Sequence, residues 1–478
     1  MNSRARIVLV PALLALGGCA VMQPPPLPES DVPQRFIGPV VEEASVWPNT
    51  DWWNNFHYAE LSTSIEEVKA NNLDLANNRR NLESAQIALR EAGLARWPEP
   101  TLTISDAESY SRTSLNGATV SRGNESDATQ LAARFTYANI ITKPATYARD
   151  LTDYDSSVAQ SADVAMNTLG TATSTFFQLL LIRDRIVAAR QNLENAEAIG
   201  RIANVRVEAG VSVPIDALQQ QIQIEQQRTA LQSLIQADLA ARASLALLVG
   251  RHVQGFDIAG QTLQDVEVPR VQPGLPSELL TRRPDVYQAE MNLRGAAVNV
   301  SVVRRSLFPN ISLTASATSS SFELANVLAS PSQTSASITA GLVQLLLDNG
   351  QRRRNIEQSK ISLESSLAVY RRTVLGAFNE VEVALSNIQL LEEQAAVAAS
   401  SLSAAEESFR IAEVRYREGV ADFETVLVSQ NSLFSTRNSF LDNKLQRLNA
   451  ILNFYQALGG GWNAGDIAEY WGVTASGR

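Results

Sequence analysis

The sequence predicts a mainly α-helical protein that carries four β-strands and is built by internal duplication. Two seven-residue stretches begin with Val-Arg and end with Gly-Val, and their glycines, Gly210 and Gly419, are 209 residues apart in number. The same offset relates Gly250 to Gly459. Similarity at a fixed offset is the signature of a repeated structural unit. We therefore expect two equivalent halves.

Each of the two stretches is predicted to be the bend of a helical hairpin. A proline-free helical pattern runs from about 145 to 206 before the first glycine, and another runs from 352 to 418 before the second. At 1.5 Å per residue, the first pattern corresponds to a helix of roughly 90 Å. Glycine ends a helix easily because it adopts the left-handed conformation without a Cβ penalty. Pro214 then fits the first turn of the following helix.

Each half also contains two stretches in which apolar and polar residues alternate, as they do in β-strands. Helical patterns at 58–97 and 279–307 precede them and end at Pro98 and Pro309, and polar loops are expected at 111–127 and 319–333. The alternating stretches lie at 101–105, 130–137, 311–318 and 337–342. Strands of about 9–11 residues span membranes, but a small soluble sheet on a helical body remains an alternative.

The first residues indicate export and attachment to a lipid. Arg4 and Arg6 precede a short apolar run that ends in Leu-Gly-Gly-Cys, and Cys19 is the only cysteine. The run is too short to span a bilayer as a helix. The ending is similar to the lipobox of bacterial lipoproteins, which implies removal of a signal peptide at 1–18 and lipidation of Cys19. An ordinary signal peptide is the alternative.

Composition excludes several classes of function. The net charge of −10 argues against a nucleic-acid-binding protein, and one cysteine with two histidines leaves little material for a metal or acid–base site. We find no nucleophile elbow and no phosphate-binding loop in the sequence. We therefore expect no enzyme activity and no cofactor apart from the covalent lipid.

If the predicted strands cross a membrane, they need further strands to pair with. Four strands cannot close a barrel, and open sheet edges are not tolerated in lipid. Several subunits must then contribute strands to one barrel. Because the strands lead directly into long helices, those helices would extend the barrel as a tube on the periplasmic side. This arrangement describes a channel.

Particular motifs give the chain a resemblance to a known family. They are the lipobox, Leu279–Val286 (Leu-Leu-Thr-Arg-Arg-Pro-Asp-Val) with Ala289, Glu290 and Leu293, Pro309, Asp348-Asn349-Gly350, and the two bends. With these motifs the chain resembles TolC-type outer membrane efflux proteins, in the NodT-like lipoprotein class that serves resistance–nodulation–division (RND) pumps. The resemblance covers nearly the whole mature chain. It departs from the family at Asn139–Pro144, where the first half lacks the turn that Asp348-Asn349-Gly350 makes.

The resemblance implies a homotrimer with a long α-helical barrel and a β-barrel completed by trimerisation, with four strands per chain and twelve in the trimer. The expected organisation is a lipoprotein signal peptide at 1–18, a lipid-anchored extended arm at 19–56, a first repeat at 57–262, a linker at 263–275, a second repeat at 276–460 and a tail at 461–478.

The resemblance also assigns roles to residues at the bends, which would form the periplasmic tip of the tunnel. Arg206, Gly210, Arg415 and Gly419 would contact an adaptor protein. The glycines also act as simple helix stops, and for the arginines a solvated helix end is an alternative.

Acidic residues follow both bends. Asp216, Asp422 and Glu424, with Arg415 and Tyr416, are the candidates for the periplasmic gate. A threefold ring of carboxylates would repel itself and attract cations, which suits a selective, pH-sensitive constriction. For Asp216 the alternative is a carboxylate that only stabilises a helix N-terminus.

We thus expect the outer membrane channel of a tripartite efflux pump, a passive exit duct for small toxic compounds. The expected partners are a periplasmic adaptor protein, an inner membrane RND-type pump and outer membrane lipids, and no nucleic acid. Two alternatives stay open, namely a periplasmic adaptor lipoprotein and a coiled-coil envelope scaffold without a pore.

Overall fold

The computed structural model describes residues 48–111, 124–270, 279–321 and 326–462. The described residues form two compact units, one containing residues 84–111, 124–156, 289–321 and 326–370 and the other containing residues 48–83, 157–270, 279–288 and 371–462. The predicted signal peptide and Cys19 lie outside the described residues. Within the described ranges, no helix combines the length and the apolar character that crossing a bilayer requires.

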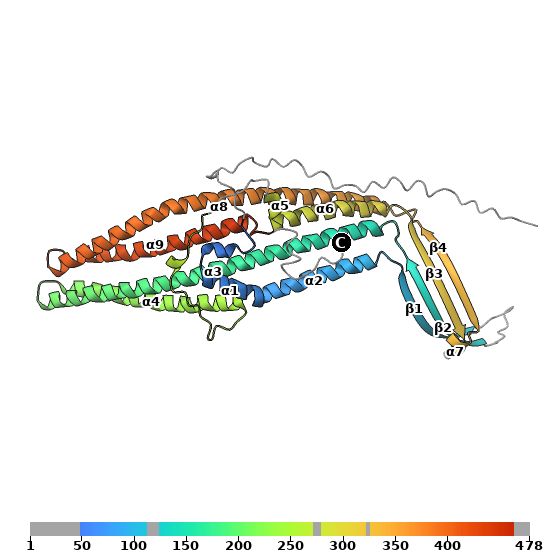
Figure 1. Cartoon of the computed structure of the whole chain (residues 1–478), viewed down its shortest axis with the longest axis horizontal. Coiled ribbons are helices and arrows are strands. Elements are labelled where there is room, and N and C mark those ends of the chain that lie inside the picture. Colours follow the sequence, from blue (N-terminus) through green and yellow to red (C-terminus); the bar gives the residue numbers. More distant parts are fainter. Residues whose placement is uncertain (1–47, 112–123, 271–278, 322–325, 463–478) are drawn as a thin grey trace, which may run out of the picture. The chain divides into compact units, whose positions relative to one another are not determined.

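The first unit contains a four-stranded antiparallel sheet in the order β1-β2-β3-β4 (Figure 1). Its strands are β1 (Glu99–Ser111), β2 (Asn124–Tyr137), β3 (Asn310–Ser321) and β4 (Gln333–Val343). All four expected strands are present, and each is longer than its alternating core. The predicted loop at 319–333 is partly wrong, because it contains the short helix α7 (Asn326–Ala329). Hydrogen-bonded pairing carries strands past the point where the hydrophobic alternation stops.

The register places most apolar residues of the four strands on one face, with Ala132 and Val343 as exceptions on the other. Leu102 lies opposite Ala133, which lies opposite Ala317, and Phe135 lies opposite Ala315, which lies opposite Ile338. Side chains on this face are exposed, with Leu102 at 71% and Ile338 at 80%. Toward the loop end the apolar rows give way to Asp106, which accepts a hydrogen bond of 2.9 Å from Thr129. An exposed apolar face of this kind needs an apolar environment or a partner.

The helices follow the predicted order. They are α1 (Ala59–Asn71), α2 (Leu73–Leu94), α3 (Lys143–Glu208), α4 (Pro214–Val249), α5 (Leu279–Arg282), α6 (Pro284–Arg305), α8 (Gln351–Arg417) and α9 (Phe423–Ala457). The expectation of single helices at 58–97 and 279–307 is wrong, because the first is broken at Asn72 and the second at Arg283.

A tertiary contact explains the first break. Asn72 adopts an extended conformation, and its side-chain Nδ2 donates to the carbonyl of Leu248 at 2.8 Å. Its Oδ1 accepts from the amide of Leu75 at 2.9 Å, which caps α2. One buried side chain therefore closes the C-terminal end of α4 and begins α2.

The second break has the same geometry with a different residue. Arg283 precedes Pro284, a position that disfavours helical conformation, and its Nη1 donates to the carbonyl of Ala457 at 2.9 Å. Leu248 and Ala457 are 209 residues apart, and Asn72 and Arg283 are 211 apart, the offset of Pro98 and Pro309. The duplication thus extends to a contact that the sequence did not predict.

Arg283 also makes ion pairs that Asn72 cannot make. The residue is 6% exposed, and its guanidinium binds both carboxylate oxygens of Asp285, at 3.0 and 2.8 Å. Its Nη2 reaches Glu380 of α8 at 2.7 Å. A buried arginine of this kind is stable only because charged partners surround it.

The end of the N-terminal arm is fastened by aromatic packing. Trp52 and Trp53, in the short helix η2 (Trp52–Phe56), are 2% and 1% exposed. Trp52 lies 5.9 Å from Tyr455 and Phe56 lies 5.1 Å from Phe177, measured between ring centroids. Trp52 and Trp53 therefore dock the end of the arm, whereas Trp47 lies outside the described residues.

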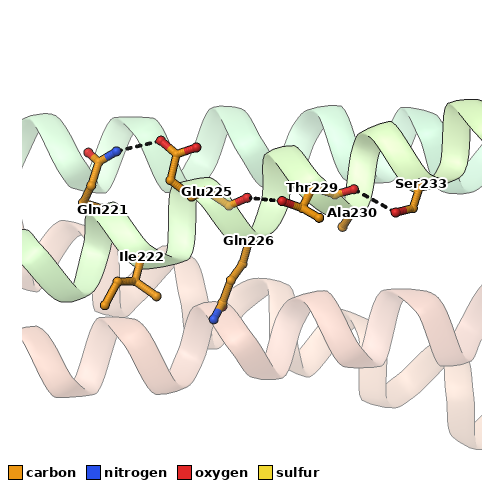
Figure 2. A pocket seen from close by; sticks show the side chains of 7 residues that line it. All are labelled: Gln221, Ile222, Glu225, Gln226, Thr229, Ala230 and Ser233. Atoms are coloured by element: carbon orange, nitrogen blue, oxygen red, sulfur yellow. Dashed lines mark hydrogen bonds between the residues drawn. The ribbon is translucent and has the colours of Figure 1, made fainter.

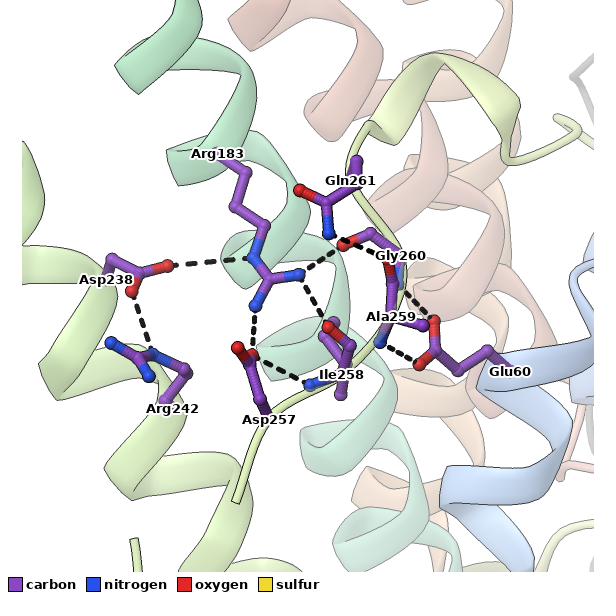
Figure 3. Close-up of polar contacts among 9 residues, drawn as sticks. All are labelled: Glu60, Arg183, Asp238, Arg242, Asp257, Ile258, Ala259, Gly260 and Gln261. Carbon is purple, nitrogen blue, oxygen red and sulfur yellow. Dashed lines mark hydrogen bonds and ion pairs between the residues drawn. The ribbon is translucent and has the colours of Figure 1, made fainter. Parts of the chain in front are cut away.

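The segment after α4 is held to the helices by an arginine of α3, as Figure 3 shows. Nη1 of Arg183 donates to the carbonyls of Ile258 (2.8 Å) and Gly260, and Nη2 pairs with Asp257. Glu60 of α1 accepts from the amide of Gly260 at 2.6 Å. This end of the expected first repeat is therefore fixed to the helices, and the turn η3 (Leu263–Asp265) begins the expected linker directly after it.

The two junctions between strand and long helix, both in the first unit, differ as expected. Asn139 has a positive φ of 57° and its carbonyl accepts from the amides of Thr142 and Lys143 at 3.0 Å. In the second half, positive φ values occur at two successive residues, Asn349 (51°) and Gly350 (78°). Both junctions thus use an asparagine in the left-handed region, where this residue is tolerated.

Candidate functional site

The first bend ends α3 through a glycine with positive φ. Gly210 has φ of 68°, its amide bonds the carbonyl of Val207 at 3.0 Å, and the amide of Val211 bonds the carbonyl of Arg206 at 3.0 Å. These two bonds satisfy carbonyls that the end of a helix leaves unpaired. Pro214 then occupies the first helical position of α4.

The second bend repeats this geometry at the end of α8. Gly419 has φ of 78°, its amide bonds the carbonyl of Tyr416 at 3.1 Å, and the amide of Val420 bonds the carbonyl of Arg415 at 2.9 Å. Every one of these partners is 209 residues from its counterpart in the first bend. The predicted pair of bends is therefore confirmed in its backbone.

Arg206 of the first bend binds the second bend. Its Nη1 donates to the carbonyl of Tyr416 at 3.0 Å, and its guanidinium carbon lies 4.9 Å from the centroid of the Tyr416 ring. A Cβ on Gly419 would lie 3.2 Å from the same Nη1, so the glycine also leaves room for this contact. A charge-assisted hydrogen bond and a cation–π contact thus join the two bends.

The contact between Arg206 and Tyr416, which we call the tether, lies on an apolar cluster in which Tyr416 is 1% exposed. The ring of Phe423, in the first turn of α9, lies 6.0 Å from the Tyr416 ring. The cluster consists of Ile199, Ala405, Phe409, Ala412, Tyr416, Phe423, Val426, Leu433 and Phe434, which come from α3, α8 and α9. Tyr416 is therefore a packed anchor that Arg206 binds from outside.

The three acidic gate candidates occupy different environments. Asp422 is the N-cap of α9 and accepts hydrogen bonds from the hydroxyl group of Thr425 and from its amide, the latter at 2.9 Å, and these bonds lower the pKa of its carboxyl group. Asp216 is half-buried and accepts a hydrogen bond from Ser212. Glu424 is exposed in the first turn of α9. Burial raises the pKa of Tyr416, and the charge of Asp216 raises it further, although Arg206 opposes this.

Arg415, the counterpart of Arg206, is exposed and lines a groove at the second bend. The groove has a volume of about 590 Å³ and is bounded on its α9 side by Asp422 and Thr425. Ala404, Ser408 and Ile411 of α8 continue it along the helix. The guanidinium group of Arg415 is therefore accessible to solvent or to a partner protein.

A buried polar layer links the two hairpins above the bends, and the sequence did not reveal it. Nε2 of Gln220 donates to the carbonyl of Ala196 at 2.8 Å and lies 3.5 Å from Oε1 of Gln430. Nε2 of Gln223 donates to Asn431 at 2.5 Å. Both Gln220 and Gln430 are fully buried. Glutamine on a helix rich in glutamine is no signal by itself, which explains why the layer was missed.

A second groove lies on the outer side of α4 (Figure 2). Its volume is about 600 Å³, and Ile222, 59% exposed, faces it together with Ala230. Gln221 and Glu225 bond each other at its rim, at 2.8 Å. The same face of α4 continues toward the bend with the exposed Ile215 and Leu218, at helical spacing.

Comparison with a protein family agrees with this architecture. The profile of the outer membrane efflux protein family matches residues 64–251 and again residues 275–460. The two matches correspond to the two halves that the bends and the helix breaks define. The chain thus contains the family's unit twice.

Individual relatives match over almost their whole length. The chain is 30% identical to the pyoverdine export outer membrane protein OpmQ of Pseudomonas putida, over 97% of this chain and 99% of that protein. It is 26% identical to the cation efflux system protein CusC of Escherichia coli, over 94% and 97%. Among solved structures, the Campylobacter jejuni CmeC outer membrane channel matches with a TM-score of 0.80 at 19% identity, covering 90% of this chain and 93% of that one.

The fold and these matches agree with the resemblance carried by the sequence motifs, and they favour it over an adaptor lipoprotein or a scaffold. The family is a transport family and not an enzyme family. The chain belongs to the outer membrane efflux protein family and is an efflux channel of the outer membrane.

Proposed function

We propose that three copies of this chain form one pore, and that this pore is the passive exit duct of a tripartite efflux pump. The observation that carries the proposal is the sheet, which has one exposed apolar face and two strands, β1 and β4, with an unpaired edge. In lipid, every backbone hydrogen-bonding group needs a partner. Pairing β1 of one copy with β4 of the next closes a barrel of twelve strands, within the range known for outer membrane barrels.

The helical unit supports the same assembly. The face of α4 with Ile215, Leu218 and Ile222 is apolar and exposed, and the groove at the second bend contains the exposed Ile411 of α8 among polar residues. We propose that the first face packs into the groove of the next copy. Two different faces that bind each other head to tail produce a ring when the rotation closes.

The bends would form the periplasmic end of the duct. Arg206 holds the two bends of one chain together through Tyr416, so release of this contact would accompany opening. Arg415 and the two glycine turns, exposed at the same end, would meet the adaptor protein, with an RND-type pump of the inner membrane beyond it. Threefold copies of Asp216, Asp422 and Glu424 would then give a cation-attracting constriction.

The substrate is expected to be selected outside this chain. The relatives are named for pyoverdine export, toluene efflux and cation efflux, which are chemically unlike one another. A passive duct accommodates such variety when the pump makes the selection. Lipidation of Cys19 would anchor the chain to the same membrane, adding a second attachment to that of the strands.

Two adjacent residues of β4 provide the test. Ile338 lies on the apolar face and Thr339 on the opposite face. A lysine on a lipid-facing position near the membrane midplane costs about 2–4 kcal/mol. We expect Ile338→Lys to reduce trimer insertion into lipid vesicles strongly and Thr339→Lys to leave it nearly unchanged. Equal insertion of both variants, or wild-type protein that inserts without conductance in a planar bilayer, would refute the proposal.

A further inference from the structure

The face of the sheet opposite the apolar one is almost free of charge. Its residues with described side chains are Glu99, Thr101, Thr103 and Ser105 of β1, Gln130, Ala132, Arg134 and Thr136 of β2, Asn310, Ser312, Thr314, Ser316, Thr318 and Ser320 of β3, and Gln333, Ser335, Ser337, Thr339, Gly341 and Val343 of β4. Hydroxyl groups dominate this face, and among the residues named only Glu99 and Arg134 are ionisable.

Arg134 stands in a row of hydroxyl residues. Its neighbours across the sheet are Thr101 on β1 and Ser316 on β3, followed by Ser337 on β4. Thr101 donates to the backbone carbonyl of Arg134 at 3.4 Å, and the hydroxyls of Ser316 and Ser337 bond each other at 2.9 Å. None of these neighbours carries a charge that could neutralise the guanidinium.

The other charge, Glu99, lies one row away. It faces Thr136, two residues along β2 from Arg134, so it is a diagonal neighbour on the same face. The ion pairs described in the first unit are made by Arg149, Arg294, Arg352 and Arg353, and none of them includes Arg134. Arg134 is exposed, and an arginine keeps its charge at any physiological pH.

We propose that Arg134 lines the lumen of the strand-built pore and favours the passage of anions through it. The inference rests on the proposed trimer, in which the apolar face contacts lipid and the hydroxyl face encloses the pore. Three copies then place three guanidinium groups around the lumen, and rings of arginine are a known basis of anion selection. The solutes favoured are those that carry carboxylate, sulfonate or phosphate groups, which guanidinium binds well.

Alternation along β2 supplies a matched control. Phe135 is the next residue, points to the apolar face and is 53% exposed. Because Cys19 is the only natural cysteine and is expected to be lipidated, a new cysteine would be the only free thiol. Arg134→Cys and Phe135→Cys can therefore be compared in the full-length trimer with water-soluble thiosulfonate reagents of either charge.

The readout is the change in reversal potential relative to wild type in a planar bilayer with a KCl gradient, because the acidic constriction proposed at the bends is present in every variant. In Arg134→Cys, the electrostatic potential of the guanidinium ring is lost. If that potential is worth about one RT per ion, the anion-to-cation permeability ratio should fall by at least about threefold. A trimethylammonium thiosulfonate should restore the ratio and a sulfonate thiosulfonate should lower it further. Neither reagent should change Phe135→Cys.

Two further variants distinguish an effect of charge on the permeability ratio from an effect of misfolding. Arg134→Gln should reproduce the loss seen with cysteine, and Glu99→Gln should shift the ratio in the opposite direction. An unchanged reversal potential in Arg134→Gln, or reagents that act at Phe135→Cys and not at Arg134→Cys, would overturn the inference. Absence of conductance in the wild-type trimer would instead refute the proposed function itself.

Discussion

In the second unit, the two repeats have the same backbone conformation at their bends and differ in the side chains that hold it. At the bends, Gly210 and Gly419 end α3 and α8 with the same pair of hydrogen bonds. The arginines four residues earlier have separated in role, because Arg206 binds the other bend and Arg415 faces solvent. Duplication therefore produced two hairpins with equal backbones, and later substitutions allowed Arg206 of the first hairpin to bind Tyr416 of the second.

The opposite ends of the same hairpins show the same relation. Asn72 closes α4 with a neutral amide, whereas Arg283 closes α9 and also pairs with Asp285 and Glu380. At these helix ends, the first half is held by the hydrogen bonds of a neutral amide and the second by a charged network. Because a buried charge without its partners is costly, the second half depends more strongly on its clamp.

The largest effect on stability is therefore expected at Asn72 and Arg283, the two residues that close α4 and α9 and that we call the clamps. Arg283→Ala removes a buried guanidinium with its hydrogen bonds to Ala457 and to the partly exposed Asp285 and Glu380, and should destabilise the end of α9 by roughly 3 kcal/mol. Asn72→Ala removes one amide and should cost about 1–3 kcal/mol. Hydrogen exchange at the last turns of α9 and α4 in the full-length protein measures both. Equal protection losses in the two variants would remove the distinction between the clamps.

An intermediate effect is expected at the arginines of the bends. Arg206→Ala removes a hydrogen bond from a charged group, worth about 1.5–3 kcal/mol, and should raise the open probability of single channels about tenfold or more. Arg415→Ala should leave the open probability near the wild-type value because this side chain holds no other bend. Tyr416→Phe should also behave like wild type, since the ring and the carbonyl that Arg206 binds remain. Opening by Arg415→Ala alone would show that the tether is misassigned.

The smallest effect concerns the start of the last helix. Asp422 caps α9, whereas the equivalent Val213 caps α4 with no side-chain hydrogen bond. Asp422→Ala should increase the amide exchange of Thr425 severalfold, and Val213→Asp should slow exchange in the first turn of α4. Loss of exchange protection in Asp422→Ala at a distant site and not at Thr425 would contradict a local capping role.

The same cap has a defined pH dependence. The pKa of Asp422 is lower in the folded chain than the usual value of about 3.9 for an unfolded aspartate. A lowered pKa gives stability that is present above the unfolded value and is lost as the pH falls through the folded value. The protection of the Thr425 amide, meaning its exchange corrected for the pH dependence of intrinsic exchange, should therefore be steady from pH 7 to about pH 5 and fall below about pH 4, and this fall should be absent in Asp422→Ala.

Much of the fold could be predicted because it is encoded by local patterns. Alternation along β2 assigned Leu131 and Phe135 to one face, and the long proline-free runs ending at Gly210 and Gly419 gave the hairpins. Of the candidate site, the position of the bends followed from the sequence. The tether from Arg206 did not, because nothing near Arg206 in the chain specifies a partner 210 residues away.

By itself, the sequence determined the order of elements, the duplication and the two faces of the sheet, since periodicity and glycine act over a few residues. Only the tertiary structure decided which of two equivalent arginines binds, and why the helices break at Asn72 and Arg283. Those choices depend on carbonyls at Tyr416, Leu248 and Ala457 that folding brings within 3.0 Å. A side chain obtains such a partner through packing of whole helices, which no short window of sequence contains.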